Sequence, residues 1–238
     1  MPTIVLLPGM DGTGDLFQPV IAALGDGFAT KVVRYPNRAL GYAALLAVAR
    51  QALPSRGPFF ILGESFSGPI AVALAASQPS GLMGLILSST FMRNPRPAWR
   101  VLRPVIDFVP MNSLPLSILS HLLLGQHATT YLRSVLASAM AQVAANTLKT
   151  RIKSVLSVDA FAQLRTVRVP LLYLMAEQDR LVPPSAAQAM LQVRPDMRVV
   201  SMAAPHLLLQ AAPRTAANAI SAFVNEVRRH ASASADPD

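Results

Sequence analysis

Short apolar runs alternate with helical patterns along most of the chain, and this alternation limits the possible folds more than any other feature of the sequence. Six runs have the composition of strands buried on both faces. They are TIVLLPG (3–9), ATKVVRYP (29–36), PFFILGES (58–65), LMGLILSST (82–90), PLLYLMAEQ (170–178) and MRVVSMAA (197–204). Helical patterns fall between or after them, at 15–24, 42–53, 68–77, 185–193 and 215–230. This succession predicts an α/β fold with a mostly parallel sheet of about six strands and helices on both faces.

The alternation stops between the fourth and fifth predicted strands. This segment begins with Pro95, Pro97 and Pro104 and then shows helical patterns, such as that of residues 128–145. We therefore expect a core made of residues 1–91 and 158–238, with a helical cap insertion at residues 92–157.

Composition favours a compact globule of this size. Of the 238 residues, 52% are hydrophobic and 14% are charged, which argues against disorder. No apolar run approaches the ~20 residues of a membrane span, so we expect no stable membrane insertion. The chain opens without the features of a secretory signal, so we expect a cytoplasmic protein. It contains no cysteine, which excludes disulfides and thiolate chemistry.

The net charge of +9 is concentrated in the predicted cap. Residues 92–156 contain one acid, Asp107, and eight basic side chains: Arg93, Arg96, Arg100, Arg103, Arg133, Lys149, Arg151 and Lys153. Such a block could attract an acidic acyl carrier protein, or it could be only a solvated arginine-rich face. Nucleic acid is not expected as a partner, because Trp99 is the only tryptophan and no aromatic series accompanies it.

The stretch ILGESFSGPI (61–70) places a small polar corner between an apolar run and a helical pattern. A serine at a tight strand-to-helix turn stands clear of both elements, provided that the residues two positions away are small. Gly63 and Ser67 meet this requirement, so Ser65 matches the nucleophile elbow G-x-S-x-G, with Ser67 in place of the second glycine. Alternatively, Ser65 could simply cap the helix.

A nucleophilic serine needs a base, and His206 is the best candidate. It follows the last predicted strand, so in a parallel sheet it would share the carboxyl edge with Ser65. The alternative for His206 is a structural turn residue. His121 and His127 lie in the cap, and His230 lies at the end of the last helix.

The histidine needs an orienting carboxylate, and the fifth predicted strand ends MAEQDRLVPP. Both Glu177 and Asp179 are candidates there. The chain order Ser65, Asp179, His206 is one of the known orders of a serine–acid–histidine triad.

Two backbone N–H groups could stabilise an oxyanion. Phe66 follows the serine at the start of the helix, and Met10 lies in the glycine-rich loop PGMDGTG (8–14). The loop also has the G-x-x-x-x-G spacing, but Asp15 and Leu16 stand where a phosphate-binding loop requires Lys and Ser or Thr. No nucleotide or metal-binding pattern is complete, so no cofactor and no metal are expected.

Together these motifs resemble the α/β-hydrolase family across nearly the whole chain. LLPGMDGTG (6–14) is similar to the oxyanion loop of a subgroup of bacterial hydrolases and of plant phytyl ester synthases. GESFSG (63–68) resembles the family's elbow, and PH (205–206) its histidine loop. DRLVP (179–183) resembles its D-x-x-V-P loop, which selects Asp179. The cap is similar in place and size to that of the pimeloyl carrier-protein methyl ester carboxylesterase. Pro8, Ser67 and Ala176 depart from the usual residues.

The resemblance implies a capped serine esterase that cleaves carboxylic esters of small to medium apolar acyl groups through an acyl-enzyme. Ser65 would be the nucleophile, His206 the base and Asp179 its orienting acid, with Met10 and Phe66 forming the oxyanion hole. Hydrolysis of a thioester, or acyl transfer involving an acyl carrier, coenzyme A or an alcohol, would use the same residues. The scaffold also supports non-catalytic binding modules.

Overall fold

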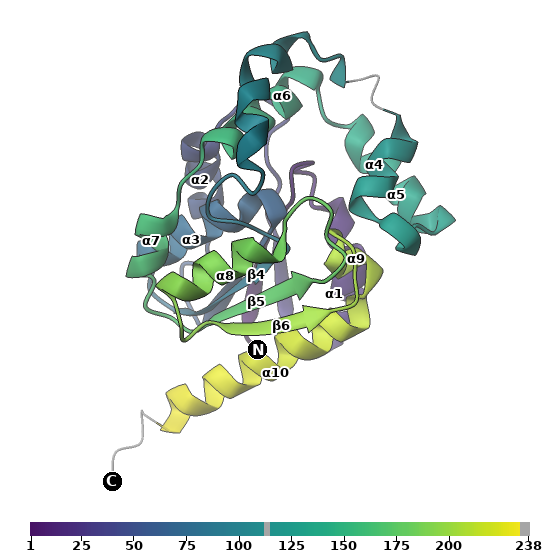
Figure 1. Cartoon of the computed structure of the whole chain (residues 1–238). Coiled ribbons are helices and arrows are strands. Elements are labelled where there is room, and N and C mark those ends of the chain that lie inside the picture. The colour runs from purple at the N-terminus through teal and green to yellow at the C-terminus, as the bar shows by residue number, and fades with distance from the viewer. Residues whose placement is uncertain (112–114, 234–238) are drawn as a thin grey trace.

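In the computed structural model, which describes residues 1–111 and 115–233, the centre of the molecule is a six-stranded sheet (Figure 1). The strands are β1 (Thr3–Leu7), β2 (Ala29–Val32), β3 (Phe59–Glu64), β4 (Leu82–Ser88), β5 (Leu171–Ala176) and β6 (Arg198–Met202). Their order is β2-β1-β3-β4-β5-β6, and every neighbouring pair is parallel. The α/β fold expected from the alternating pattern is confirmed.

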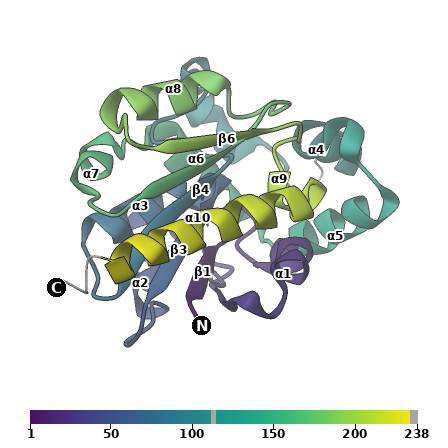
Figure 2. The same cartoon turned by 90° about the horizontal axis from the view of Figure 1, so that it is seen from below.

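Helices cover both faces of the sheet (Figure 2). One face packs against α2 (Tyr42–Gln51), α3 (Gly68–Ala76), α7 (Phe161–Thr166) and α8 (Pro184–Val193). The other packs against α1 (Gln18–Leu24), α9 (Leu208–Ala211) and α10 (Pro213–Ala233). Successive strand side chains point to opposite faces, so Val5 joins the first apolar cluster while Ile4 and Leu6 join the second. Burial on both sides explains why each central strand is a continuous apolar run.

Between β4 and β5, the described residues of the segment 92–157 form helices and no strand of the sheet. We call this segment the cap. Its helical elements are η4 (Pro97–Phe108), α4 (Leu116–Leu123), η6 (Gly125–His127), α5 (Thr130–Ala141) and α6 (Ala145–Ser157). Its helices α4, α5 and α6 lie on the opposite side of the sheet from α10 (Figure 1).

The helix predicted over residues 128–145 is present but shorter, because α5 ends at Ala141 and α6 begins at Ala145. Asn37, from the loop after β2, stabilises the break. Its Nδ2 donates to the carbonyl of Gln142 at 2.7 Å, and its Oδ1 accepts from the amide of Ala144 at 2.8 Å. The carbonyl at the end of one helix and the amide at the start of the next have no partner within their own helix, so Asn37 supplies one for each. The apolar pattern continues across the break, so the sequence gives no local sign of it.

Among the helices of the described residues, α10 is the longest, with 21 residues from Pro213 to Ala233, and it is amphipathic, with Ile220, Phe223 and Val224 among its buried side chains. In residues 1–111 and 115–233, no helix combines the length and apolar character that crossing a bilayer requires.

Candidate active site

Ser65 lies at the turn between β3 and α3, as the first residue of the short helix η3 (Ser65–Ser67). Its φ angle is 46°, in the left-handed region that non-glycine residues seldom occupy. The hydroxyl of Thr90 donates to the carbonyl oxygen of Ser65, and the hydroxyl of Tyr173 donates to the carbonyl of Thr90 at 2.9 Å. Side chains from the β4 and β5 side of the sheet therefore hold the strained turn.

Two glycines permit the close approach of strand and helix at this turn. A Cβ atom on Gly63 would lie 2.6 Å from the Cβ of Ala71, and one on Gly68 would lie 2.0 Å from Oγ1 of Thr90. Both distances are too short for real contacts. The second position that must be glycine is therefore 68, one residue after the position named by G-x-S-x-G.

Ser67 has a different role from the glycine it replaces. It is fully buried, and its hydroxyl donates to the carbonyl oxygen of Pro8 while lying 2.8 Å from the hydroxyl of Tyr35. Because the Ser67 proton is used on Pro8, Tyr35 is the donor to Ser67. This side chain links the elbow to the loop that follows β1.

His206 lies against Ser65 in the folded chain. Its Nε2 is 2.7 Å from Oγ of Ser65, and its Nδ1 is 2.7 Å from Oδ2 of Asp179. The histidine and aspartate side chains are 4% and 2% exposed. The other oxygen of Asp179 accepts from the amides of Leu181 and Val182, both at 2.8 Å. The carboxylate is therefore held in place to face Nδ1.

The structure thus joins the three side chains that sequence patterns put on three separate loops. Glu177, the alternative acid, is exposed, and Asp179 alone of the two bonds His206. The other three histidines, all within the described residues, do not line the cavity at Ser65.

The loop after β1 lies at the same cavity. Gly9 and Met10 line it together with Ser65 and Phe66. The amide of Gly12 donates to the carbonyl of Gly9 at 3.1 Å, which closes a tight turn around Met10. Met10 and Phe66 therefore both border the space next to the serine hydroxyl.

Arg151 reaches this loop from α6 of the cap. Its Nη1 donates to the carbonyls of Met10 and Asp11, both at 2.8 Å, and its Nη2 donates to the carbonyl of Pro36 at 3.1 Å. The residue is 1% exposed, and its guanidinium carbon lies 5.8 Å from the centre of the Tyr35 ring. Burial lowers the pKa of Arg151, and the nearby Asp11 charge opposes this effect.

Arg151 is therefore not part of a basic surface block, and the expectation that it lies on the surface was wrong. The sequence contained one sign of this burial: Arg151 lies three residues after the apolar Leu148, and residues three apart lie on one face of a helix. Gly12 accommodates the guanidinium, since a Cβ atom there would lie 2.5 Å from Nη1 of Arg151.

Glu64 is a second buried group that the sequence patterns did not identify. It precedes the serine and is 1% exposed, and Nε2 of Gln210 donates to its Oε1 at 2.9 Å. Burial raises the pKa of Glu64 to about 7; Asp11 adds to the rise and His206 opposes it. An acid inside an otherwise apolar strand was the signal for such a group.

The cavity at Ser65 has a volume of about 310 Å³ and is lined in part by cap side chains. Apolar residues such as Leu119, Met140 and Ile152 make up most of its lining. Its titratable side chains, from Asp11, Glu64 and His206, come from the core. Among the described residues, no group of three His, Asp or Glu side chains is placed to hold a metal ion.

Comparison with known proteins gives one family match. The family model described as "Serine aminopeptidase, S33" matches residues 40–203. Phytyl ester synthase 1 of Arabidopsis thaliana is 34% identical over 117 residues, covering 46% of this chain and 16% of the relative. Polyketide synthase ThaQ of Burkholderia thailandensis is 26% identical over 262 aligned positions, covering 98% of this chain and 12% of the relative. The chain thus spans less than a fifth of either protein.

Solved structures share the fold at low sequence identity. A hydrolase from Oleispira antarctica superposes with a TM-score of 0.82 and 16% identity, covering 94% of this chain and 91% of its own. An esterase from Exiguobacterium antarcticum has a TM-score of 0.78 and 13% identity, with coverages of 94% and 92%. The enol-lactonase from Burkholderia xenovorans has a TM-score of 0.79 and 17% identity, with coverages of 94% and 91%.

Proposed function

The chain belongs to the serine aminopeptidase S33 family of α/β-hydrolases, and we propose that it cleaves carboxylic esters of apolar acyl groups. One observation carries the proposal: the continuous hydrogen-bonded path from Ser65 through His206 to Asp179 begins in an apolar cavity. A serine hydroxyl is a weak nucleophile unless a base removes its proton during attack. The site supplies that base beside a space that suits a hydrocarbon chain.

In the first half of the reaction, Oγ of Ser65 attacks the ester carbonyl carbon and its proton passes to Nε2 of His206. Asp179 stabilises the imidazolium through Nδ1. The amides of Met10 and Phe66 receive the negative oxygen. When the tetrahedral intermediate collapses, the bond to the alcohol oxygen breaks, and His206 returns its proton to that oxygen. An acyl group is left on Ser65.

In the second half, water replaces the alcohol. His206 removes a proton from the water as its oxygen attacks the acyl carbon, and the same amides hold the oxyanion. The bond between the acyl carbon and Oγ of Ser65 then breaks, and His206 returns the proton to Oγ. The carboxylic acid leaves and the free enzyme is restored.

The family description names an aminopeptidase, so peptide cleavage is a competing function. Such a substrate carries an ammonium group, which needs a charged partner when it leaves water. The carboxyls that line the cavity already accept hydrogen bonds within the protein: Oδ2 of Asp11 accepts from the amide and hydroxyl of Thr13, and Oε1 of Glu64 accepts from Nε2 of Gln210. The predominantly apolar lining favours a neutral ester.

A direct comparison of substrates tests the proposal. We expect the wild type to hydrolyse p-nitrophenyl butyrate and to leave leucine p-nitroanilide nearly untouched, with ester hydrolysis lost in Ser65→Ala. Ester hydrolysis that survives in Ser65→Ala would remove the serine from the mechanism. Preferred cleavage of the anilide would favour the peptidase.

Acyl transfer is the second candidate, because a relative named phytyl ester synthase matches 46% of the chain. The same acyl-enzyme would pass its acyl group to an alcohol oxygen in place of water. Product analysis with added long-chain alcohols distinguishes the two, since transfer forms a new ester while hydrolysis forms only the acid.

Thioester hydrolysis on an acidic acyl carrier would use the same residues, with the carrier docked on the cap. The exposed basic side chains available for it are Arg100, Arg103 and Arg133. Others are used internally: Arg93 pairs with Asp159 at 2.6 Å, Lys153 pairs with Asp107 at 2.5 Å, and Arg151 is buried. Less charge is therefore free for docking than the sequence suggests, so a free ester is the preferred substrate.

A further inference from the structure

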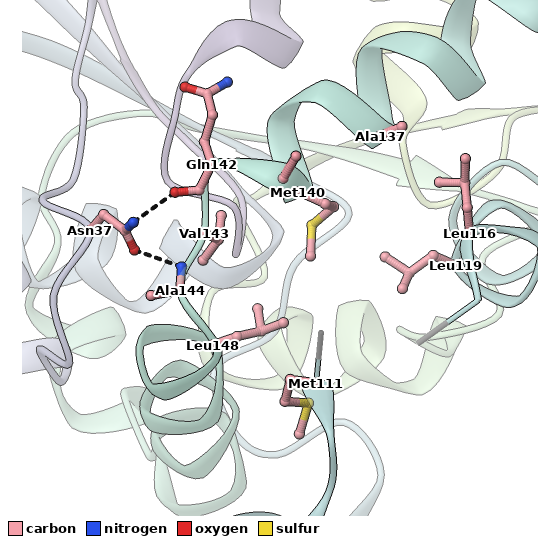
Figure 3. Close-up of a pocket in the computed structure, with 11 residues that line it drawn as sticks. Asn37, Met111, Leu116, Leu119, Ala137, Met140, Gln142, Val143, Ala144 and Leu148 are labelled. Carbon is pink, nitrogen blue, oxygen red and sulfur yellow. Dashed lines mark hydrogen bonds between the residues drawn. The ribbon is translucent and has the colours of Figure 1, made fainter. Parts of the chain in front are cut away.

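A second cavity, of about 500 Å³, lies between α4, α5 and α6 of the cap (Figure 3). Its lining includes Leu116 and Leu119 from α4, Ala137 and Met140 from α5, and Leu148 from α6. In Figure 3 the side chains of Leu119, Met140 and Leu148 point toward a common space. Among the described residues that line this cavity, none is charged.

Those same three side chains also line the cavity at Ser65. Leu119, Met140 and Leu148 therefore form a shared boundary between the two spaces. Leucine and methionine side chains change rotamer without breaking hydrogen bonds, and methionine is especially adaptable. We propose that the second cavity binds the far end of a long acyl chain whose carbonyl lies at Ser65. This inference rests on the proposed esterase function.

The sizes of the two cavities favour placing the carbonyl end of the acyl chain at Ser65 and its far end in the second cavity. The space at Ser65, about 310 Å³, is at the lower end of the range of about 300–1,000 Å³ for small-molecule pockets. A long chain that begins there has to continue elsewhere, and the shared boundary leads to a larger space lined mostly by apolar side chains. Under this proposal the preferred acyl groups are longer than the small to medium groups expected from the sequence.

The two side-chain amides that line the second cavity, those of Asn37 and Gln142, already make hydrogen bonds within the protein, and the other lining residues are apolar, so the end of the chain is apolar. Asn37 uses both ends of its amide on the backbone of Gln142 and Ala144. The side-chain nitrogen of Gln142 donates to Asp15 at 3.0 Å and to the carbonyl of Ser138 at 3.2 Å. A carboxylate at the chain end would find no cationic partner among these residues.

The acyl part of the ester is the expected occupant, because it stays on Ser65 after the alcohol has left. Apolar burial along the chain then holds the acyl-enzyme in one orientation while water attacks. Each buried methylene contributes roughly a fourfold preference.

The test uses p-nitrophenyl esters with chains from butyrate to hexadecanoate, below the concentration at which they form micelles. Ala137→Trp fills the second cavity from α5, and Leu116→Trp fills it from α4; neither residue lines the cavity at Ser65. Ser134→Trp, on the exposed side of α5, is the matched control. We expect each filling variant to lower the kcat/KM ratio of dodecanoate to butyrate at least tenfold, while the control keeps the wild-type ratio.

Unchanged ratios in both filling variants would overturn the inference. So would a preference that follows the length of the alcohol in alkyl acetates rather than the length of the acyl chain.

Calorimetric binding of hexadecanoate and octanoate to Ser65→Ala, with and without Ala137→Trp, separates this inference from the proposed function. Butyrate hydrolysis that depends on Ser65, together with hexadecanoate binding that Ala137→Trp leaves unchanged, means that only the inference fails. Absence of ester hydrolysis, together with hexadecanoate binding that Ala137→Trp weakens at least tenfold, means that only the esterase function fails.

Discussion

Nη1 of Arg151 donates a hydrogen bond of 2.8 Å to the carbonyl oxygen of Met10. The two residues are 141 positions apart and connect helix α6 of the cap with the loop proposed to bind the oxyanion. The cap therefore contributes to the arrangement of this loop as well as lining the cavity at Ser65. Arg151 is fully buried, so we expect it to affect the reaction only by positioning the backbone of this loop.

We expect Arg151→Lys to lower kcat about tenfold to a hundredfold with a smaller change in KM, because the amide of Met10 would be held less firmly where charge develops. An ammonium group cannot replace two donors in a planar fork. Steady-state kinetics on a short ester measure the effect, with the exposed Arg133→Lys as control. A loss of thermal stability with kcat intact would mean that Arg151 serves the fold alone.

Glu64 should make the stability depend on pH. Its pKa is about 7 in the folded chain against an ordinary value of 4.5, so the unfolded chain releases this proton first as pH rises. The free energy of unfolding is therefore unaffected by the titration of Glu64 below about pH 4.5, where the group is protonated in both states. It decreases by about 3 kcal/mol as the pH rises from about 4.5 to about 7.

Glu64→Gln should remove that pH dependence. The difference in the free energy of unfolding between Glu64→Gln and wild type should therefore be more favourable to the variant at pH 8 than at pH 4. Urea unfolding at both values measures the gain, and the exposed Asp26→Asn is the control. An unaltered pH dependence in Glu64→Gln would show that Glu64 titrates normally.

Ser67→Gly restores the G-x-S-x-G pattern, yet we expect it to destabilise the protein. The substitution leaves the carbonyl of Pro8 and the hydroxyl of Tyr35 without their buried partner, which costs about 1–3 kcal/mol per group. Urea denaturation of Ser67→Ala, Tyr35→Phe and the double variant measures the coupling between the two hydroxyls. A Ser67→Gly protein as stable as wild type would contradict this role.

Asp179→Asn should lower kcat by roughly 10³ to 10⁴, because an amide cannot stabilise the imidazolium that forms during attack. Glu177→Gln should leave kcat unchanged, since Glu177 is exposed and does not bond His206. Esterase kinetics on both variants separate the two acids. Equal losses would mean that Glu177 also acts at the site.

The fold could be predicted because burial on both faces makes the central strands apolar throughout, and the intervening helices have their own period. Ser65, His206 and Asp179 could be placed together because parallel strands bring their carboxyl ends to one edge. The break between α5 and α6 could not be found in this way, because it depends on Asn37, more than one hundred residues away. Local patterns do not contain such partners.

The role of Arg151 escaped prediction for a related reason. A charged residue is usually exposed, and its burial here depends on the backbone carbonyls of a loop that only the folded chain brings near. The second cavity is likewise a property of how three helices pack, so the sequence of each helix shows only an apolar face.

The reaction of Ser65 with a fluorophosphonate tests the proton path most directly. Intact mass spectrometry and peptide mapping should find one adduct on Ser65 in the wild type, with labelling at least a thousandfold slower in His206→Ala. Equal labelling rates in the two proteins, or an adduct on another residue, would contradict the account.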